Sequence, residues 1–262
     1  MTELNNLVAH APRAEYAGGE LPPDWYAPSV EGLKQARQWR LLGLVPTSSE
    51  VLHRPVQRIP EDEIACDRTR KVVQKLLRVA EEKGVMGLAA NQLGIDADIF
   101  VGALETPSCY TKPTEQRAYV NATVTAKGDE QLRGFHACLS VLGGFGGLVW
   151  SPAKINLSGW KPDGTPVQNE EWAGYGASIA CHEVGHLRGE LYPTRIYQQG
   201  GSFDYRPPEV RPQYNARMDA ELDGQQVEPW PCPVPEAQWQ AMCSGAYNLE
   251  DFYLPDDKQK NM

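Results

Sequence analysis

The sequence feature that most constrains this chain is the run from Cys181 to His186, which contains the pattern His-Glu-x-x-His. His182 and His186 are four residues apart, so on a helix they lie one above the other on the same face and can bind one metal ion between them. Glu183 lies beside them, where a carboxylate can take a proton from a metal-bound water. Residues 176–188 are therefore predicted to form a metal-binding helix, and two imidazoles leave its site short of a ligand.

The composition predicts a soluble globular protein that acts on a small molecule or a peptide. Hydrophobic residues make up 41% of the chain and charged residues 23%, which are ordinary values. A net charge of -9 gives phosphate backbones little to attract them, so we expect no nucleic-acid partner. No apolar run approaches the roughly 20 residues needed to cross a bilayer, and no basic and then apolar leader opens the chain. We therefore expect no membrane association and a cytoplasmic location.

The cysteines are too scattered to predict a disulfide framework. Free thiols plus one possible metal ligand, in a reducing compartment, fit their spacing better. Cys181 points about 100° away from His182 around the helix, which predicts a core position. The six are Cys66, Cys109, Cys138, Cys181, Cys232 and Cys243.

The apolar pattern predicts an α+β domain. From residue 64 to 82 apolar side chains recur three and four apart, and Gly84 suits the C-terminal cap, so this segment is predicted to be a helix that starts near Pro60. Short strands are expected at 98–101, 118–121, 122–125 and 154–160, with a hairpin turn at 161–164. Strands that do not alternate regularly with helices favour mixed or antiparallel sheets, packed here around the central metal-binding helix.

Proline-rich stretches bound this domain on both sides. We predict an N-terminal extension at 1–48 with a helix over 30–42, and a catalytic domain at 49–197. We predict a C-terminal extension at 198–262, with a short helix at 236–243 and a disordered end.

Three stretches resemble, in order, the three motifs of the peptide deformylase family. Residues 86–92 resemble the first motif, which has a glycine, an apolar residue, two alanines and a glutamine. Residues 137–140 resemble the second, whose core is Gly-Cys-Leu-Ser, and residues 182–186 resemble the third. The resemblance covers residues 51–197 and implies a metal-dependent hydrolase that removes formate from an N-formyl amine by attack of a metal-bound water.

The resemblance also implies the third metal ligand. Cys138 would complete a Cys-His-His set with His182 and His186, because a thiolate binds divalent metals strongly, and the fourth position would stay open for water. The metal would be one divalent ion per chain, Fe(II) or Zn(II).

The catalytic groups follow from the same resemblance. Glu183 would act as general base and then donate a proton to the leaving amine. The backbone N–H of Leu139 and the side-chain amide of Gln92 would donate hydrogen bonds to the oxyanion that forms at the formyl carbonyl.

The chain also departs from the family pattern around the substrate pocket. His136 and Ala137 replace Glu-Gly, Gly185 replaces an aspartate, and Ser151 stands near the position of a missing arginine. In the family the glutamate and the arginine are charged neighbours that border the pocket. Losing one charge of such a buried group would cost roughly 3 to 5 kcal/mol, so the joint absence of both residues is coherent and suggests that the pocket has been rebuilt. Val85 and Asn91 replace a glycine and a proline. The expected pocket residues are Val85, Gly87, His136, Ser151 and Gly185.

The sequence leaves alternatives open for both the substrate and the class of protein. The substrate is an N-formyl-methionyl peptide or another N-formylated peptide or metabolite. One rival is a zinc metallopeptidase whose third ligand is Glu209 or Glu221. The other is a deformylase-like protein that binds a formylated ligand or a partner without turnover.

Overall fold

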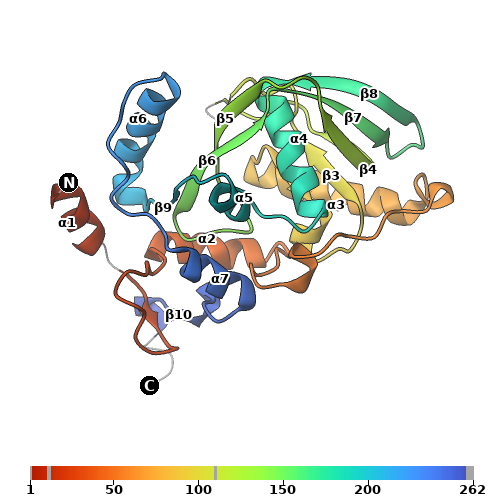
Figure 1. Ribbon diagram of the computed structural model, residues 1–262. Helices are drawn as coiled ribbons and strands as arrows, with labels where there is room; N and C mark the ends of the chain where they lie inside the picture. Colours follow the sequence, from red (N-terminus) through yellow and green to blue (C-terminus); the bar gives the residue numbers. More distant parts are fainter. Residues whose placement is uncertain (1, 11–12, 109–110, 258–262) are drawn as a thin grey trace. The chain divides into compact units, whose positions relative to one another are not determined.

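The computed structural model describes residues 2–10, 13–108 and 111–257, and Figure 1 labels its helices and strands. The chain divides into two compact units. The first consists of Met1–Ser48, Phe135–Val149 and Pro193–Met262, and the second of Ser49–Gly134 and Trp150–Tyr192.

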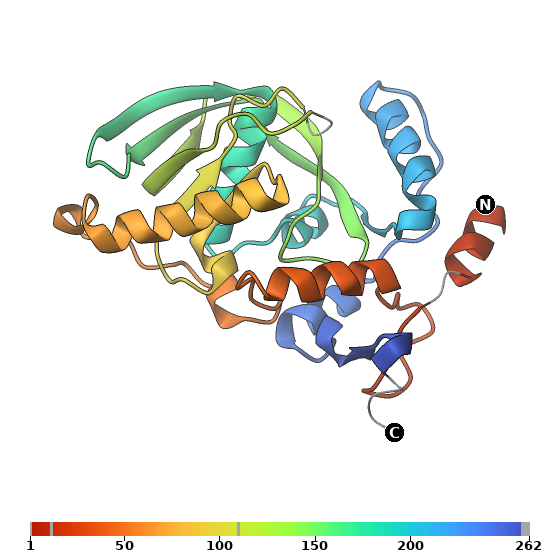
Figure 2. The same cartoon turned by 180° about the vertical axis from the view of Figure 1, so that it is seen from behind.

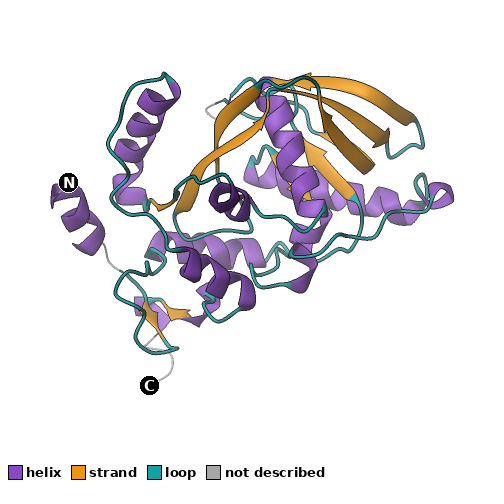
Figure 3. Cartoon of the chain, viewed as in Figure 1, coloured by secondary structure: helices purple, strands orange, loops and turns teal. Residues whose placement is uncertain are grey.

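The second unit is built on one five-stranded sheet (Figure 3). Its strands, in spatial order, are β2 (Gly87–Ala89), β3 (Ile99–Gly102), β4 (Arg117–Ala126), β7 (Lys154–Trp160) and β8 (Pro166–Ala173). All neighbouring strands are antiparallel. The two short strands predicted over 118–125 are a single strand, β4, whose register shifts near Asn121, a residue with a φ of +53°. The side chain of Asn121 stabilises this irregular point because it pairs with the backbone N–H and C=O of Ile59.

Two helices of this unit cover opposite faces of β3. Helix α4 (Gly174–Leu187) lies in front of β3 in Figure 1, and α3 (Asp67–Lys83) lies in front of it in the reverse view of Figure 2. All four residues of β3 are buried, as expected of a strand covered on both faces. The C-terminal cap predicted at Gly84 is confirmed by its φ of +61°. The predicted start near Pro60 is wrong: Glu61–Glu63 form a separate 3-10 turn, and α3 begins only after Cys66.

The core of this unit lies between α4 and the sheet. Its apolar side chains come from the helix, from the strands and from the adjoining segments that carry Val56 and Leu104, which is the arrangement expected of a helix packed on a sheet. The buried members are Val56, Ala89, Phe100, Leu104, Tyr119, Ala122, Ile155, Leu157, Val167, Ala177, Ile179, Ala180, Cys181, Val184 and Leu187. Cys181 is therefore a core residue, as predicted.

The first unit is mainly helical. Its helices are α1 (Thr2–His10), α2 (Val30–Arg40), α6 (Arg211–Leu222) and α7 (Glu236–Ser244), with α5 (Tyr192–Gln198) beginning at its boundary. The predicted helices at 30–42 and 236–243 are confirmed by α2 and α7. Helix α6 was not predicted, because only Tyr214 and Met218 of this segment are buried and they form a thin apolar stripe.

Two smaller sheets complete the fold. Strands β1 (Glu15–Tyr16) and β10 (Phe252–Tyr253) pair with each other, and β5 (Gln131–His136), β6 (Phe145–Pro152) and β9 (Phe203–Tyr205) form a three-stranded sheet. The sequence predicted no strand at 134–150, where glycines obscure the period of two. A Cβ on Gly147 of β6 would lie 2.7 Å from the carbonyl oxygen of Ser202, so this glycine lets two backbones approach closely.

The described part of the chain holds no helix of sufficient length and apolar character to cross a membrane. Its cysteines are free thiols, as predicted: Cys66, Cys138, Cys181, Cys232 and Cys243. Cys109 lies outside the described residues, as does most of the C-terminal end that was predicted to be disordered. The division into segments 1–48, 49–197 and 198–262 stays a prediction.

Candidate metal centre

Helix α4 positions both histidines and the glutamate. Its residues are buried almost all the way around, which is typical of a helix inside a domain rather than on its surface. The helix follows β8 directly through Gly174, whose φ of +59° allows the chain to turn. It ends at Arg188, whose N–H donates to the carbonyl oxygens of Val184 at 3.1 Å and Gly185 at 2.9 Å. The predicted helix over 176–188 is therefore confirmed with nearly the expected bounds.

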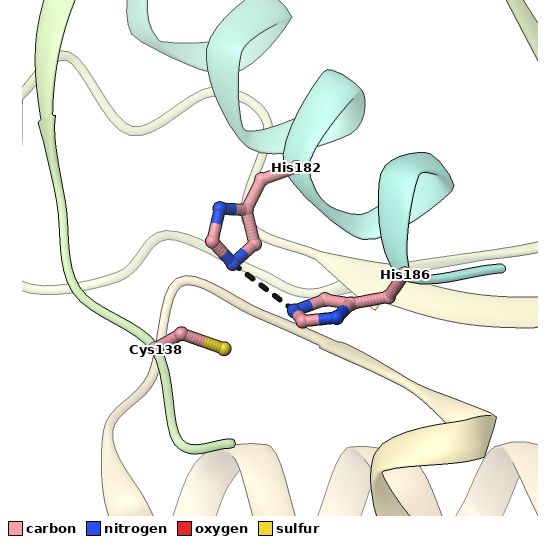
Figure 4. Close-up of side chains that lie close together, drawn as sticks. All are labelled: Cys138, His182 and His186. Atoms are coloured by element: carbon pink, nitrogen blue, oxygen red, sulfur yellow. Dashed lines mark hydrogen bonds between the residues drawn. The ribbon is translucent and has the colours of Figure 1, made fainter. Parts of the chain in front are cut away.

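The two histidine rings meet at their Nε2 atoms. Nε2 of His182 lies 3.1 Å from Nε2 of His186, and the ring centroids are 4.8 Å apart in an edge-on arrangement (Figure 4). His182 is also stacked on Tyr192, with centroids 5.9 Å apart. The one-turn spacing of the motif thus brings two imidazole lone pairs to the same point.

Cys138 joins these histidines. The Sγ atom of Cys138 and one ring nitrogen each of His182 and His186 all lie within 4.8 Å of one another. Figure 4 shows the thiol directed toward the two rings. Among the described residues, this is the group of potential ligands that contains both histidines, and it includes neither Glu209 nor Glu221.

The donor set fits a tetrahedral divalent metal. Two nitrogens each about 2.0–2.1 Å from a metal ion in tetrahedral geometry are about 3.3 Å apart. The observed separation of 3.1 Å between the Nε2 atoms of His182 and His186 is close to this value. Two imidazoles and a thiolate suit iron or zinc better than magnesium or calcium, which prefer oxygen ligands. Three protein ligands leave one coordination position for water or substrate, as in catalytic sites.

The loop around Cys138 directs a backbone hydrogen-bond donor at its sulfur. The backbone N–H of Ser140 donates to Sγ at 3.4 Å, and the N–H of Val141 donates to the carbonyl oxygen of Cys138 at 3.1 Å. The hydroxyl of Thr47 donates to the carbonyl oxygen of Ser140 at 2.5 Å. An N–H directed at sulfur stabilises negative charge on it, which suits a thiolate ligand. Leu139, between Cys138 and Ser140, is buried at 8% exposure.

Glu183 is a buried carboxyl group. The residue is 4% exposed, and Oε2 has no hydrogen-bond partner among the described residues. Burial raises the pKa of this carboxyl well above its ordinary value, because the charged form loses its hydration. A raised pKa makes the carboxylate a stronger base than an exposed glutamate, which suits a group that takes up and later releases a proton.

Gln92 is oriented by the backbone just before it. It lies in the short 3-10 helix Ala90–Leu93, and its Oε1 accepts a hydrogen bond from the N–H of Ala89 at 2.8 Å. Since the oxygen of the amide is held in this way, its Nε2 remains as the donor end. This orientation suits the predicted oxyanion role of Gln92.

The structure gives Asn91 a role that its sequence position did not suggest. It is fully buried, and Nδ2 donates to the carbonyl oxygen of His186 at 2.5 Å and to that of Val51 at 3.2 Å. An amide where the family pattern has proline, next to Gln92, was the only signal for this contact.

Of the expected pocket residues, the structure brings one to the candidate centre. Gly87 lies against Glu183, since a Cβ built on it would be 2.4 Å from Oε1. The others remain predictions. The carbonyl oxygen of Val85 accepts from Gln116 Nε2 at 2.7 Å, while His136 at the end of β5, Ser151 in β6 and Gly185 in α4 are all buried. Ser151 Oγ has no hydrogen-bond partner among the described residues.

Comparisons with known proteins identify the family. The model of the family described as polypeptide deformylase matches residues 42–201. The chain is 28% identical over 197 residues to "Peptide deformylase 1A, chloroplastic" of Solanum lycopersicum, covering 70% of this chain and 68% of the relative. It is 32% identical over 139 residues to "Peptide deformylase 1" of Xanthomonas campestris, covering 52% of this chain and 80% of the relative.

Solved structures agree on the fold. A Met-Ala-Ser-bound class I type b peptide deformylase from Acinetobacter baumannii superposes with a TM-score of 0.53 at 22% identity, covering 58% of this chain and 97% of that one. An actinonin-bound peptide deformylase from Synechococcus elongatus gives 0.51 at 23% identity, covering 70% and 88%. Helices and antiparallel sheets here form the peptide deformylase fold. The chain belongs to the polypeptide deformylase family, as the resemblance of its three motifs implied.

Proposed function

We propose that this chain is a metal-dependent hydrolase that removes formate from N-formyl peptides. The observation that carries the proposal is the meeting of the Cys138 thiol with the imidazoles of His182 and His186, within 4.8 Å, in a chain that belongs to the deformylase family. The metallopeptidase rival loses its support, since neither of its proposed third ligands belongs to that group.

Cys138, His182 and His186 would hold one divalent ion, either Fe(II) or Zn(II). When bound, such an ion supplies Lewis acidity and makes water a nucleophile near neutral pH. The backbone N–H of Ser140 helps the thiolate to carry its charge. Asn91 fixes the end of α4 through the carbonyl oxygen of His186.

Glu183 would move the protons of the reaction. Its buried carboxylate takes a proton from the attacking water and later gives it to the amine that leaves. Raising the pKa of this group by burial makes it a stronger base than an exposed glutamate, which favours the first transfer. Because no described residue partners Oε2, that oxygen is available for the proton.

Gln92 and Leu139 would stabilise the charge on the formyl oxygen. The hydrogen bond from Ala89 N–H to Gln92 Oε1 leaves Nε2 as the donor end of the amide before substrate arrives. The N–H of Leu139, in the residue after the thiol ligand, supplies the second donor. Donors fixed in advance stabilise an oxyanion without further reorganisation, and losing one typically reduces kcat by a factor of about 100 to 1000.

For the substrate we propose an N-formyl-methionyl peptide first and another N-formylated peptide or metabolite second. The related Acinetobacter structure is bound to Met-Ala-Ser. The uncharged residues Ser151 and Gly185, and His136, would give this pocket a different lining. We further propose residues 49–197 as the catalytic domain and a cytoplasmic location without nucleic-acid or membrane partners, although the tomato relative is described as chloroplastic.

The test is purification without oxygen, metal analysis, and assay of formate release from a panel of formylated peptides and metabolites. We expect about one iron or zinc ion per chain, release from at least one substrate, and loss of release in Glu183→Gln. Absence of release from every substrate, with metal bound and Glu183 intact, would contradict the proposal.

Two variants separate the rivals. Cys138→Ala is expected to lose the metal, whereas retention of the metal would point to a third ligand elsewhere. Glu183→Gln that binds a formylated peptide and leaves the measured rate unchanged would favour a protein that binds without turnover.

A further inference from the structure

Two neighbouring glycines lie under one face of α4. Gly87 of β2 and Gly102 of β3 are opposite each other in an antiparallel pair, so their Cβ positions point to the same face of the sheet. A Cβ on Gly102 would lie 3.4 Å from the side chain of Ile179, and one on Gly87 would meet Glu183. Ile179 and Glu183 are four residues apart and share a face of the helix. The glycine pair on the sheet therefore matches a one-turn pair on α4, which packs against both strands.

Glu183 lies along Gly87 for much of its length. From an ideal Cβ on Gly87, Oε1 of Glu183 would be 2.4 Å away, and Cδ and Cγ would each be 2.7 Å away. Non-bonded carbon atoms prefer separations of about 3.5 to 4.0 Å. An alanine at position 87 therefore cannot coexist with this placement of the Glu183 side chain.

This conflict concerns space and not backbone conformation. Gly87 is not among the residues with positive φ, so its backbone suits alanine as well as glycine. Strand β2 is held by its pairing with β3, and its preceding residue Met86 accepts a hydrogen bond from the N–H of Ala103 at 2.8 Å. Glu183 instead ends in a flexible carboxyl whose Oε2 has no partner among the described residues. The glutamate side chain, and not the strand, would have to move.

We propose that Gly87 is a positioning residue for Glu183, because the missing side chain at position 87 leaves the space in which the carboxylate of the general base lies. This inference rests on the proposed function, in which Glu183 transfers the protons. A displacement of about 1 Å in a catalytic group can cost about 100-fold in rate. Gly87 would thus control kcat through the position of Glu183.

A thermal double-mutant cycle tests the packing without any assay of activity. We compare the effect of Gly87→Ala on Tm in the full chain with its effect in a Glu183→Ala background. We expect a loss of roughly 3 °C or more in the first case, from overpacking. In the second case we expect a loss of less than about 1 °C, since the conflicting atoms are gone. Equal losses in both backgrounds would overturn the inference.

Kinetics test the consequence for the reaction, with Gly134→Ala as the matched control. Gly134 is a strand glycine of the same unit, and a Cβ there would have only Ser178 Oγ nearby, at 3.9 Å. We expect Gly87→Ala to lower kcat about 100-fold with unchanged metal content and a KM within about threefold of the original, while Gly134→Ala changes neither. An intact kcat in Gly87→Ala, with or without a higher KM, would contradict the positioning role.

The two experiments keep the inference separate from the proposed function. If the original chain releases no formate from any formylated substrate, the proposed function fails. The thermal cycle then still decides whether Gly87 makes the space for Glu183.

Discussion

Asn91 Nδ2 donates a hydrogen bond to the carbonyl oxygen of His186 at 2.5 Å, which connects the residue before Gln92 to the C-terminal end of α4. The same amide donates to the carbonyl oxygen of Val51 at 3.2 Å. One buried side chain thus connects the predicted oxyanion donor, a predicted metal ligand and the segment at which the second unit begins.

Replacing Asn91 by leucine is expected to destabilise the protein by about 1–3 kcal/mol, because the carbonyl oxygens of His186 and Val51 each lose a hydrogen bond from the buried amide. It should also weaken zinc binding, since the N–H of Gly189 is then the donor that remains on the carbonyl oxygen of His186. Urea unfolding of the metal-free protein and a zinc titration measure the two effects. Asn156→Leu is the control, on half-buried β7, and should leave zinc affinity unchanged. Equal zinc affinity in the two variants would show that Asn91 does not position His186.

The ion pair between Arg188 and Asp98 gives a pH-dependent prediction. Arg188 Nη1 lies 2.9 Å from Oδ2 of Asp98, whose side chain is 0% exposed. Burial raises the pKa of Asp98 above its ordinary value, and Arg188 opposes the rise. We expect Arg188→Met to lower the free energy of unfolding by about 3 kcal/mol at pH 7, because a buried carboxylate then loses its counterion.

The loss should shrink as the pH falls, because Asp98 then takes up a proton and no longer needs the counterion. Unfolding curves at several pH values measure this trend. Arg70→Met is the control, since Arg70 forms an exposed pair with Asp67 and should cost less than about 0.5 kcal/mol. A loss in Arg188→Met that is independent of pH would mean that Arg188 stabilises the fold through packing alone.

The helices that position the candidate site could be predicted because their signals are local. The apolar spacing and Gly84 predict α3 within a few residues, and the one-turn spacing of His182 and His186 predicts that their rings converge. By contrast, the proximity of Cys138 depends on the fold, and no spacing rule could give it. The resemblance to the family motifs suggested it instead.

The parts that could not be predicted depend on long-range contacts. Strand β6 is rich in glycine, and it pairs with β9, where Gly146 is opposite Asp204. The bond from Asn91 to His186 joins residues 95 positions apart. A single sequence shows neither partner, because side-chain reach and strand pairing are set by tertiary structure. The space that Gly87 leaves for Glu183 likewise depends on the packing of α4 against β2.

Asp204 is expected to make the stability of the first unit depend on pH. It is buried in β9, where Tyr214 donates to its Oδ2 at 2.9 Å, and burial raises its pKa from 3.8 to about 6. The folded state therefore binds a proton more readily than the unfolded state, so stability falls as pH rises from about 4 to 6. The full difference is about 3 kcal/mol.

Asp204→Asn removes this titration and keeps an acceptor for Tyr214. We expect the variant to gain stability relative to the original chain as pH rises from 4 to 7. Urea unfolding at both pH values measures the difference, with the exposed Asp219→Asn of α6 as control. Parallel stability profiles for Asp204→Asn and the original chain would mean that Asp204 is not the group responsible.

Zinc added to the metal-free protein should stabilise it, because the metal binds the assembled Cys-His-His set and not the unfolded chain. At a concentration 100 times Kd the gain is about 2.7 kcal/mol, or a rise in Tm of roughly 5–10 °C for a chain of this size. Cys138→Ala and His186→Ala should each lose most of this rise. Cys243→Ala changes a thiol outside the ligand group and should keep it. An equal rise in Cys138→Ala would mean that zinc binds without the thiol, and the three-residue centre would then be wrong.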